Sequence, residues 1–282
     1  MSDVIDKVAA LPPLRQLVDQ TDLNARKSLG QNFIFDLNLT QRIARAAAPF
    51  DGPVFEIGPG PGGLTRALFL QGAKQVIAIE KDRRVIAFLD HLVAATQGSL
   101  TLVEADALHH PIWQTAEGPR KIVANLPYNI ATALLMTWLD HIDAFASMTL
   151  MFQREVALRL VASPGDKAYG RLSVITQWLC ETELKFDVPP QAFVPAPKVT
   201  SSVVHLVPRT QPLYACAKQD LEAVTAIAFG QRRKMLRASF KKYGGEGLLN
   251  NVNIAPSARP QDLSIEQFCR LASSMRERDL LT

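Results

Sequence analysis

The sequence feature that most constrains the fold is a glycine-rich stretch that follows a short apolar run, Val54-Phe-Glu-Ile-Gly-Pro-Gly-Pro-Gly-Gly63. Residues 64–70 then repeat apolar side chains at helical spacing, so the segment predicts a strand, a tight turn and a helix. Glycines let a ligand approach the backbone, and the helix start directs unpaired N–H groups toward it. The spacing Gly58-x-Gly60-x-x-Gly63 also matches the dinucleotide fingerprint. The motif therefore predicts an adenosine-containing cofactor without choosing one, and a turn without a ligand is the simpler alternative.

Composition excludes several classes of protein. The chain has 282 residues, of which 48% are hydrophobic and 21% charged, enough for one large or two unequal folded domains. The first 11 residues lack the apolar core of a secretory signal, and the apolar run at 130–139 is too short to span a bilayer. Three widely separated cysteines and five histidines show no metal-ligand spacing. We therefore expect a cytoplasmic protein with no metal site and no membrane partner.

Strand and helix patterns alternate beyond the glycine-rich stretch. We expect strands at 75–79, 100–103, 121–124 and 147–152, and helices at 36–48, 81–95, 130–139, 153–161 and 171–180. This alternation is typical of a doubly wound, mostly parallel α/β sheet, whose ligands bind beyond the carboxyl ends of the strands. Four residues follow or end those strands, so they are expected to line one crevice: Gly58, Glu80, Asp106 and Asn125.

The pattern divides the chain into three parts. Residues 1–25 read as an extension with little structure apart from a possible short helix at 13–19. Residues 26–208 form the expected catalytic domain, which closes with an antiparallel hairpin of strands at 183–188 and 201–207. The composition then shifts, and residues 209–282 predict a small helical domain with helices at 218–229, 231–242 and 264–274.

Two carboxylates at strand ends suit a nucleoside. Glu80 lies 22 residues after Gly58, where a carboxylate can accept hydrogen bonds from both ribose hydroxyls of NAD or of S-adenosylmethionine. Asp106 can accept from the exocyclic amine of an adenine, although it can equally be the N-cap of a short helix. A surface glutamate that opens a helix is the alternative for Glu80.

The segment Asn125-Leu-Pro-Tyr128 favours methyl transfer to an exocyclic base amine. Such an amine is a poor nucleophile because its lone pair is delocalised into the ring. The side-chain oxygen of Asn125 and the carbonyl oxygen of Leu126 can each accept one of its N–H groups, while Pro127 stiffens the turn. Tyr128 offers a ring on which a flipped or unpaired base can stack. A generic Asn-x-Pro turn is the alternative.

A basic segment near the C-terminus predicts a nucleic-acid contact. Residues 209–282 hold 12 Lys and Arg against 7 Asp and Glu, and residues 231–242 carry six positive charges and no acid. If 231–242 is one helix, Arg233, Arg237 and Lys241 share a face, while Leu236 and Phe240 attach it to the core. We expect phosphate contacts from the basic residues of this segment, and a solvated surface is the alternative. The candidate residues are Arg232, Arg233, Lys234, Arg237 and Lys241.

These motifs together resemble those of class I S-adenosylmethionine-dependent methyltransferases, and within them the ribosomal RNA adenine N6,N6-dimethyltransferases. The seven blocks that carry the resemblance are Leu-Gly30-Gln-Asn-Phe, Glu56-Ile-Gly-Pro-Gly60, Ile79-Glu80-Lys-Asp82, Glu104-Ala-Asp106-Ala-Leu, Asn125-Leu-Pro-Tyr128-Asn-Ile, Phe193-Val-Pro-Ala-Pro-Lys198-Val-Thr-Ser and Phe229-Gly-Gln-Arg-Arg-Lys-Met-Leu-Arg237. The resemblance implies a Rossmann-like, seven-stranded sheet with a helical C-terminal domain.

The resemblance also implies roles for individual residues. It places the S-adenosyl-L-methionine contacts at Asn32, Ile34, Gly58, Glu80, Asp106 and Asn125, and the catalytic motif at Asn125, Leu126, Pro127 and Tyr128. The implied reaction is dimethylation of two adjacent adenosines near the 3′ end of 16S rRNA in the small ribosomal subunit. The implied enzyme is a monomer with no DNA partner. Gln153-Arg-Glu-Val-Ala, Asp166-Lys-Ala-Tyr-Gly170-Arg-Leu-Ser and Leu126 resemble this small-subunit type.

Three other functions remain open on the sequence. The macrolide-resistance methyltransferases of large-subunit rRNA share much of the pattern. An NAD-dependent dehydrogenase accounts for the glycines and Glu80, but it leaves Asn125-Leu-Pro-Tyr128 without a role. A non-catalytic ribosome assembly factor with the same fold is the third alternative.

Overall fold

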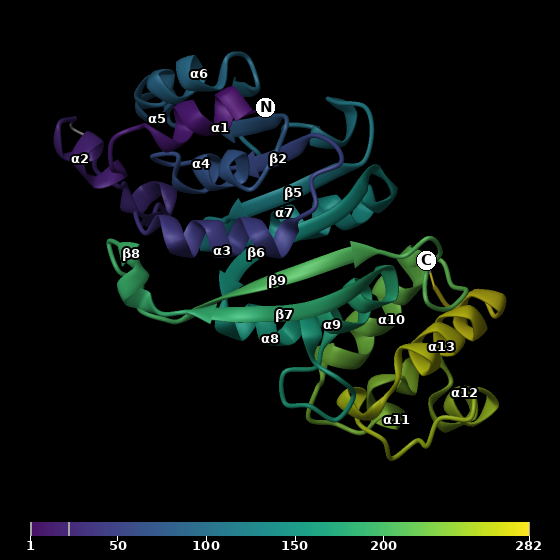
Figure 1. The fold of residues 1–282 in the computed structure, drawn as a ribbon. Helices are drawn as coiled ribbons and strands as arrows, with labels where there is room; N and C mark the ends of the chain where they lie inside the picture. The colour runs from purple at the N-terminus through teal and green to yellow at the C-terminus, as the bar shows by residue number, and fades with distance from the viewer. Residues whose placement is uncertain (1, 22, 282) are drawn as a thin grey trace. The chain divides into compact units, whose positions relative to one another are not determined.

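A seven-stranded sheet forms the centre of the larger part of the protein (Figure 1). The structure is a computed structural model that describes residues 2–21 and 23–281. The strand order is β4-β3-β2-β5-β6-β9-β7. The strands are β2 (Val54–Ile57), β3 (Val76–Glu80), β4 (Leu100–Glu104), β5 (Arg120–Asn125), β6 (Phe145–Gln153), β7 (Cys180–Val188) and β9 (Ser201–Pro208).

The sheet is mostly parallel, as the alternating pattern predicted. β2 pairs in parallel with β3 and β5, and the parallel pairing continues to β4 on one side and β6 on the other. β9 pairs antiparallel with β6, and Figure 1 shows β7 and β9 pointing in opposite directions. β2 and β3 are buried along their whole length, which explains their continuous apolar sequences. A separate two-stranded pair joins β1 (Phe33–Ile34) to β8 (Phe193–Val194).

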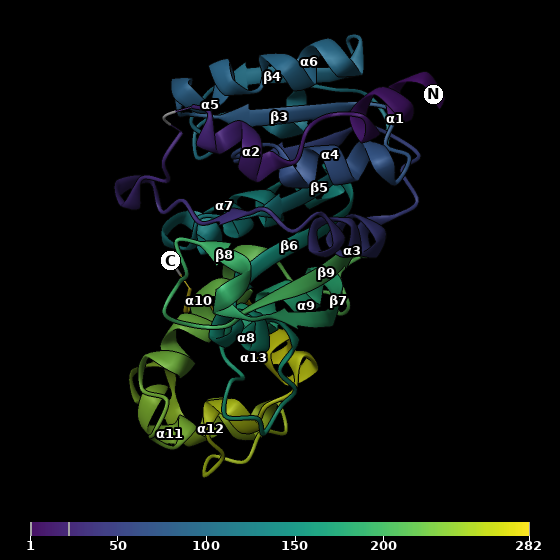
Figure 2. The same ribbon diagram turned by 60° about the vertical axis from the view of Figure 1, so that its left-hand side comes forward.

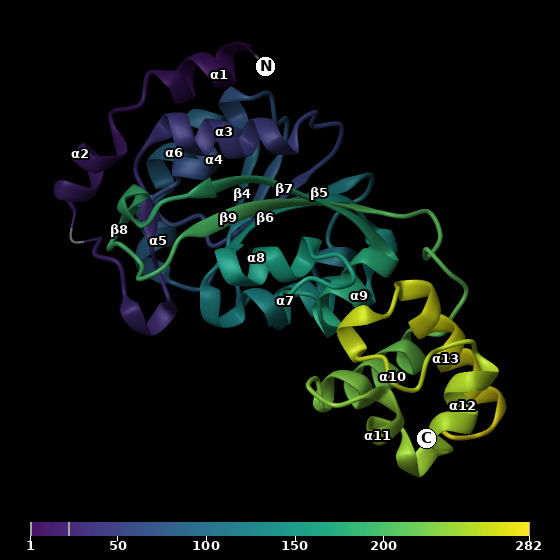
Figure 3. The same ribbon diagram turned by 90° about the horizontal axis from the view of Figure 1, so that it is seen from below.

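Helices cover both faces of the sheet (Figure 3). α3 (Leu37–Ala47) and α4 (Gly63–Leu70) lie on one face, and α7 (Tyr128–Asp140) lies on the other. Asp36 fixes the start of α3 because its carboxylate accepts from the backbone amides of Asn38 and Leu39. Lys121 of β5 is nearly buried, and its ammonium donates to carbonyl oxygens at the end of α3, including that of Ala47. An apolar core cluster lies on the face of the sheet that α3 and α4 cover.

The N-terminal extension is more ordered than the sequence predicted. It contains two helices, α1 (Ser2–Ala9) and α2 (Leu14–Asp19), of which only the second was expected. α1 packs against α4 and α6 (Asp90–Thr96), as Figures 1 and 2 show. The expectation of little structure at 1–25 was therefore wrong for α1, because its apolar residues bury themselves against neighbours that are distant in sequence.

The expected single helix at 81–95 is divided. Asp82 caps α5 (Arg83–Phe88), and α6 follows after a break at Leu89. The amide of Leu89 donates to the carbonyl oxygens of both Val85 and Ile86, which tightens the backbone at this residue. The fully buried Leu89 side chain belongs to the core, so packing fixes the break.

Contacts divide the chain into two compact units. The first contains residues 1–157 and 183–208, and the second contains residues 158–182 and 209–282. The second unit resumes next to the boundary expected near Pro208, and it also takes residues 158–182, which the sequence analysis assigned to the catalytic domain. The α-helices that follow β6 in the chain are α8 (Arg154–Val161), α9 (Arg171–Leu179), α10 (Lys218–Gly230), α11 (Leu236–Ser239), α12 (Gly245–Asn251) and α13 (Ile265–Glu277). None of the helices in the described ranges is long and apolar enough to cross a membrane.

The basic segment 231–242 is not one helix, so that prediction was wrong. α10 ends at Gly230, and the chain turns through residues 231–235 before the short α11. The amides of Leu236 and Arg237 donate to the carbonyl oxygens of Ala258 and Pro256 instead of to a preceding helical turn. These long-range hydrogen bonds fix the backbone at the start of α11, which is therefore a separate helix from α10.

Candidate functional site

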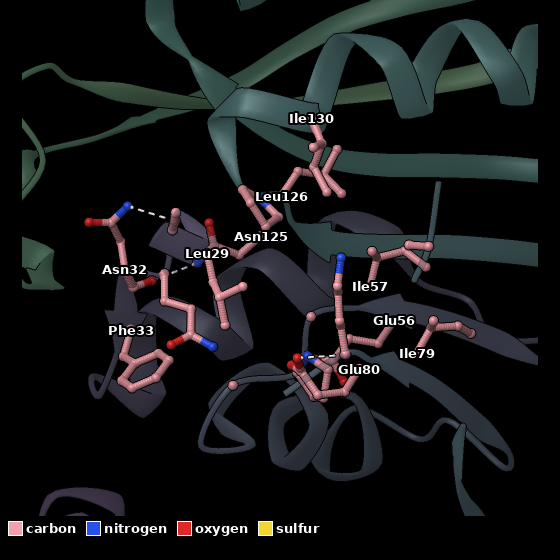
Figure 4. A pocket seen from close by; sticks show the side chains of 18 of the residues that line it. Leu29, Asn32, Phe33, Glu56, Ile57, Ile79, Glu80, Asn125, Leu126 and Ile130 are labelled. Carbon is pink, nitrogen blue, oxygen red and sulfur yellow. Dashed lines mark hydrogen bonds between the residues drawn. The ribbon is translucent and has the colours of Figure 1, made fainter. Parts of the chain in front are cut away.

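A pocket of about 220 Å³ opens at the carboxyl ends of β2, β3, β4 and β5 (Figure 4). All four strand-end residues expected to converge line it, and two residues of the entry segment line it as well. These six residues are Gly58, Glu80, Asp106, Asn125, Asn32 and Ile34. Figure 4 shows Asn125 and Leu126 on one side of the pocket and Glu56 and Glu80 on the other. The whole pocket belongs to the first compact unit.

The glycine-rich turn forms one wall of this pocket. The amide of Gly58 donates to the carbonyl oxygen of Ile79 at 2.9 Å, which joins the turn to the neighbouring strand. Gly58 has a φ of +68°, a conformation that other L-residues rarely adopt. A Cβ at this position would meet no atom within 4 Å, so the backbone here faces open space. This wall can therefore receive a ligand against its main chain.

Glu80 is held in place at the end of β3. Its Oε1 accepts from the backbone amides of Lys81 and Asp82, both at 2.8 Å, and the residue is only 7% exposed. Burial raises the pKa of Glu80, and the amides that donate to it act in the opposite direction. A fixed carboxylate that lines a pocket in this way is a suitable acceptor for the hydroxyls of a ribose.

Asp106 lies two residues beyond β4 and has two partners of its own. Its Oδ2 is 2.7 Å from the ammonium of Lys81, and its Oδ1 accepts from the amide of Leu108 at 3.1 Å. The hydrogen bond from Lys81 holds the pKa of this carboxyl below its usual range. Asp106 therefore caps a turn at residues 107–109 and not the short helix that was one alternative, while it also lines the pocket.

Glu56 is a pocket residue to which the sequence analysis gave no role. It lies in β2, is 1% exposed, and its Oε2 has no hydrogen-bond partner in the structure. Burial raises the pKa of Glu56 to about 8, and the charge on Glu80 adds to that effect. The signal in the sequence was an acidic residue inside an otherwise apolar strand, a position that carboxylates rarely occupy without a partner.

Asn125 ends β5 with a defined side-chain orientation. Its Nδ2 donates to the carbonyl oxygen of Asn32 at 3.1 Å, and this bond leaves Oδ1 available as an acceptor. No described residue donates to the carbonyl oxygen of Leu126. Asn125 and Leu126 both line the pocket, and each carries an acceptor oxygen that no described residue occupies.

Pro127 and Tyr128 form the start of α7. Pro127 lines the pocket, whereas the side chain of Tyr128 is outside the lining. The Tyr128 hydroxyl is 2.5 Å from Oγ of Ser201, a fully buried residue at the start of β9. The ring of Tyr128 is half-buried, so this bond fixes its orientation.

The basic candidates lie in the second compact unit, and all five are exposed. Leu236 and Phe240 are fully buried, which confirms that they attach the segment to its core. Two of the basic residues have partners: Arg232 donates to the carbonyl oxygen of Lys167, and Arg237 forms an ion pair with Glu246 at 3.2 Å. Arg233, Lys234 and Lys241 form no ion pair with another described residue, and they remain available to an anionic ligand.

The charges of the pocket select among cofactors. Three carboxylates line it, from Glu56, Glu80 and Asp106, and Lys81 is the one basic residue among its described lining. The carboxylates of Glu80 and Asp106 oppose the anionic pyrophosphate of a dinucleotide, and as acceptors they suit a ribose diol together with cationic sulfonium and ammonium groups. The raised pKa keeps the Glu56 carboxyl protonated in the empty pocket at neutral pH, and a cationic ligand beside its orphaned oxygen would favour the ionised form. The fold and the pocket define a class I S-adenosylmethionine-dependent methyltransferase.

The comparisons with known proteins identify the family. The family model described as "Ribosomal RNA adenine dimethylase" matches residues 22–277, and the chain therefore belongs to that family. "Ribosomal RNA small subunit methyltransferase A" of Rhodospirillum rubrum is 55% identical over 98% of both chains. A protein of the same name from Paramagnetospirillum magneticum is 55% identical over 97% of this chain and 98% of its own.

Solved structures agree with this assignment. A dimethyladenosine transferase from Plasmodium falciparum has a TM-score of 0.74 and 25% identity, covering 88% of this chain and 98% of its own. The 23S rRNA methyltransferase ErmE has a TM-score of 0.69 and 30% identity, covering 87% and 100%. The chain is thus a methyltransferase of the ribosomal RNA adenine dimethylase family. The dehydrogenase and the non-catalytic assembly factor are not favoured. The large-subunit alternative is also not favoured, since the 55% identical relatives carry the small-subunit name.

Proposed function

We propose that this enzyme dimethylates the N6 amines of two adjacent adenosines near the 3′ end of 16S rRNA during small-subunit biogenesis. S-adenosylmethionine is the methyl donor, and the enzyme acts in the cytoplasm as a monomer. The observation that carries the proposal is Asn125, whose amide group donates to Asn32 and whose oxygen is left beside the pocket. The full-length relatives named as small-subunit methyltransferases support the choice of substrate.

The reaction depends on the position of the base amine. The cofactor supplies an electrophilic methyl group on its sulfonium when it is bound. Asn125 Oδ1 and the Leu126 carbonyl oxygen each accept one N–H, which turns the nitrogen lone pair toward that methyl group. Alignment provides most of the rate, and the proton that the amine loses passes to solvent without a dedicated general base. Glu80 binds the ribose hydroxyls, and Asp106 contacts the adenine edge of the cofactor.

The RNA is held by different residues from those that orient the amine. The ring of Tyr128 stacks on the extruded adenine, and Asn125-Leu-Pro127 faces its amine edge. Exposed basic residues of the second unit contact phosphates and position the RNA without reading its sequence. These contacts come from Arg232, Arg233, Lys234, Arg237 and Lys241.

A comparison of the two ribosomal subunits as substrates tests this function. The protein is incubated with S-adenosylmethionine and with small or large subunits prepared from cells that lack the modification. We expect methyl incorporation into small-subunit rRNA at adjacent adenosines near its 3′ end. Incorporation into large-subunit rRNA instead would overturn the proposed substrate and restore the macrolide-resistance alternative.

A further inference from the structure

The N-terminal extension makes contacts that reach the wall of the cofactor pocket. Val8 and Leu23 are buried, and both belong to the same apolar core as Leu64 and Leu68 of α4. α4 is the helix that begins at the glycine-rich turn. The extension is therefore part of the packing that holds this helix, and Figure 2 shows α1 lying beside α4.

Leu14 forms the closest contact with the pocket wall. It is 5% exposed, and its Cδ1 lies 3.2 Å from the position that a Cβ on Gly63 would occupy. The carbonyl oxygen of Ile34 lies 2.7 Å from the same position on another side. Gly63 and Ile34 both line the pocket. The side chain of Leu14 thus fills the space directly behind the first residue of α4.

Arg66 of α4 fixes the extension to this helix. It is 4% exposed, its Nη1 donates to the carbonyl oxygen of Pro12 at 2.7 Å, and its Nη2 lies 3.0 Å from Nε2 of His91. Nδ1 of His91 lies 2.7 Å from the carbonyl oxygen of Phe88, so His91 donates there and accepts from Arg66. Burial lowers the pKa of Arg66 to about 10, so it remains charged at neutral pH. Nε of Arg66 is buried without a partner, so the two terminal nitrogens make the contacts, and the charge-assisted bond from Nη1 holds the carbonyl of Pro12.

A chain of hydrogen bonds also connects the end of the extension to Glu80. The carbonyl oxygen of Asn24 accepts from Nη1 of Arg84 at 3.3 Å, and Nη2 of Arg84 is 2.6 Å from Asp82. Asp82 accepts from the side chain of Gln31, which lines the pocket, and its backbone amide donates to Glu80. The extension therefore contacts both the glycine-rich turn and the turn that fixes Glu80.

We propose that residues 2–21 together with Leu23 and Asn24 form a positioning segment of the cofactor site, in which Leu14 sets the start of α4 and Arg66 fixes the segment. This inference rests on the proposed function, because it takes S-adenosylmethionine as the ligand of the pocket. If the extension only stabilised the fold, then removing one of its contacts would lower the melting temperature of the protein without changing the affinity of the folded pocket for its cofactor.

Leu14→Ala and Val8→Ala form a matched pair of variants. Both remove buried apolar atoms of the extension, but only Leu14 lies against Gly63. We expect both variants to melt earlier than the wild-type protein. In calorimetry well below both melting temperatures, Leu14→Ala should bind S-adenosylmethionine about 2- to 30-fold more weakly, while Val8→Ala keeps the wild-type affinity. Leu14→Met should restore most of the affinity, because it conserves volume.

Hydrogen exchange of the cofactor-free protein provides a second readout. Leu14→Ala should lose protection in the first hydrogen-bonded turn of α4, around residues 66–69, and Val8→Ala should keep it. Equal cofactor affinity in Leu14→Ala and the wild type would overturn the positioning role, and so would an equal loss in both variants. A wild-type protein that failed to bind S-adenosylmethionine would overturn the proposed function, and with it this inference. If the wild-type protein binds S-adenosylmethionine and methylates RNA, and Leu14→Ala has the same cofactor affinity, then only the positioning role is overturned and the proposed function stands.

Discussion

Glu80 is the residue whose replacement should most directly weaken the binding of the cofactor. Its carboxylate is fixed by two backbone amides and lines the pocket, so Glu80→Ala leaves those amides and the ribose hydroxyls without an acceptor. We expect a loss of ~1–3 kcal/mol in S-adenosylmethionine binding by calorimetry. Glu104→Ala is the matched control, because Glu104 ends the next strand but is exposed and outside the pocket lining. Unchanged affinity in Glu80→Ala would remove this residue from the site.

Glu56 should make the stability of the cofactor-free protein depend on pH. Its pKa is raised from 4.5 to about 8 in the folded protein, so between these values the folded state holds a proton that the unfolded chain releases. The free energy of unfolding must then fall as pH rises through this window. Urea unfolding of wild type and Glu56→Gln should show the wild type losing stability relative to the variant as pH rises from about 5 to 8, and no further change above that. A constant difference between the two proteins would contradict the raised pKa.

Tyr128 should separate the role of the ring from that of its hydroxyl. Tyr128→Phe leaves the buried Ser201 hydroxyl without this partner, which should lower the free energy of unfolding by ~0.5–1.5 kcal/mol. Most methyl transfer should remain, because the ring that stacks on the base is retained. Tyr128→Ala should lose a further ~1–3 kcal/mol of base stacking, measured as weaker RNA binding and slower single-turnover transfer. If Tyr128→Phe were as inactive as Tyr128→Ala, the hydroxyl would have a chemical role and the stacking account would be wrong.

At the residue scale, the sequence indicated which residues meet at the pocket but not how they are bonded. Strand ends at one edge of a parallel sheet converge by topology, so Gly58, Glu80 and Asn125 were predictable together. The pairing of Asp106 with Lys81 and that of Tyr128 with Ser201 depend on side-chain orientation. No periodic pattern in the sequence encodes such orientations.

At the element scale, the basic segment of the second unit should act through exposed charges and not through a helical face. Arg233 and Lys234 are exposed and lie in the turn before α11. We expect Arg233→Ala with Lys234→Ala to weaken binding to small subunits. The slope of log binding constant against log salt concentration should become less steep by ~0.7–0.9 for each phosphate contact that is lost. Filter binding across a salt series measures this slope.

Arg237→Ala is a second test of the same segment, and it also breaks an exposed ion pair with Glu246. An exposed ion pair contributes little to stability, so the loss of this pair should not unfold the protein. A change in the salt slope of small-subunit binding by Arg237→Ala would therefore report an RNA contact. Cofactor affinity should stay at the wild-type value in every variant of the segment, because the pocket belongs to the first compact unit. An unaltered slope in the double variant would show that the segment is only a solvated surface.

Helix predictions failed where long-range contacts decide the backbone. Residues 231–242 contain good helix formers, but Leu236 and Arg237 donate to carbonyl oxygens more than 15 residues away in the sequence. α1 went unpredicted for a related reason, since its burial against α4 and α6 supplies stability that its short sequence lacks. α13 was predicted well because it has a regular apolar stripe and a Ser264 cap at its start, and α10 was found at the expected residues although its apolar stripe is weak.

At the scale of the whole molecule, the alternation of strands and helices was sufficient to predict a mostly parallel doubly wound sheet. The central strands β2 and β3 are short buried runs next to glycines and acids, which makes their ends visible in the sequence. The place of residues 158–182 in the second compact unit was not predictable, because the local sequence pattern gives no measure of contact density. The family assignment and the pocket agree on a single class of chemistry.

The identity of the methylated nucleoside tests the central claim most directly. Unmethylated small subunits are incubated with tritiated S-adenosylmethionine and either wild-type protein or Asn125→Ala, and the digested rRNA is separated into nucleosides. The account predicts that the label from wild-type reactions ends in N6,N6-dimethyladenosine on two adjacent residues near the 3′ end. Asn125→Ala should bind the subunit but turn over far more slowly. Label in any nucleoside other than an N6-methylated adenosine, or an Asn125→Ala variant as fast as wild type, would contradict the account.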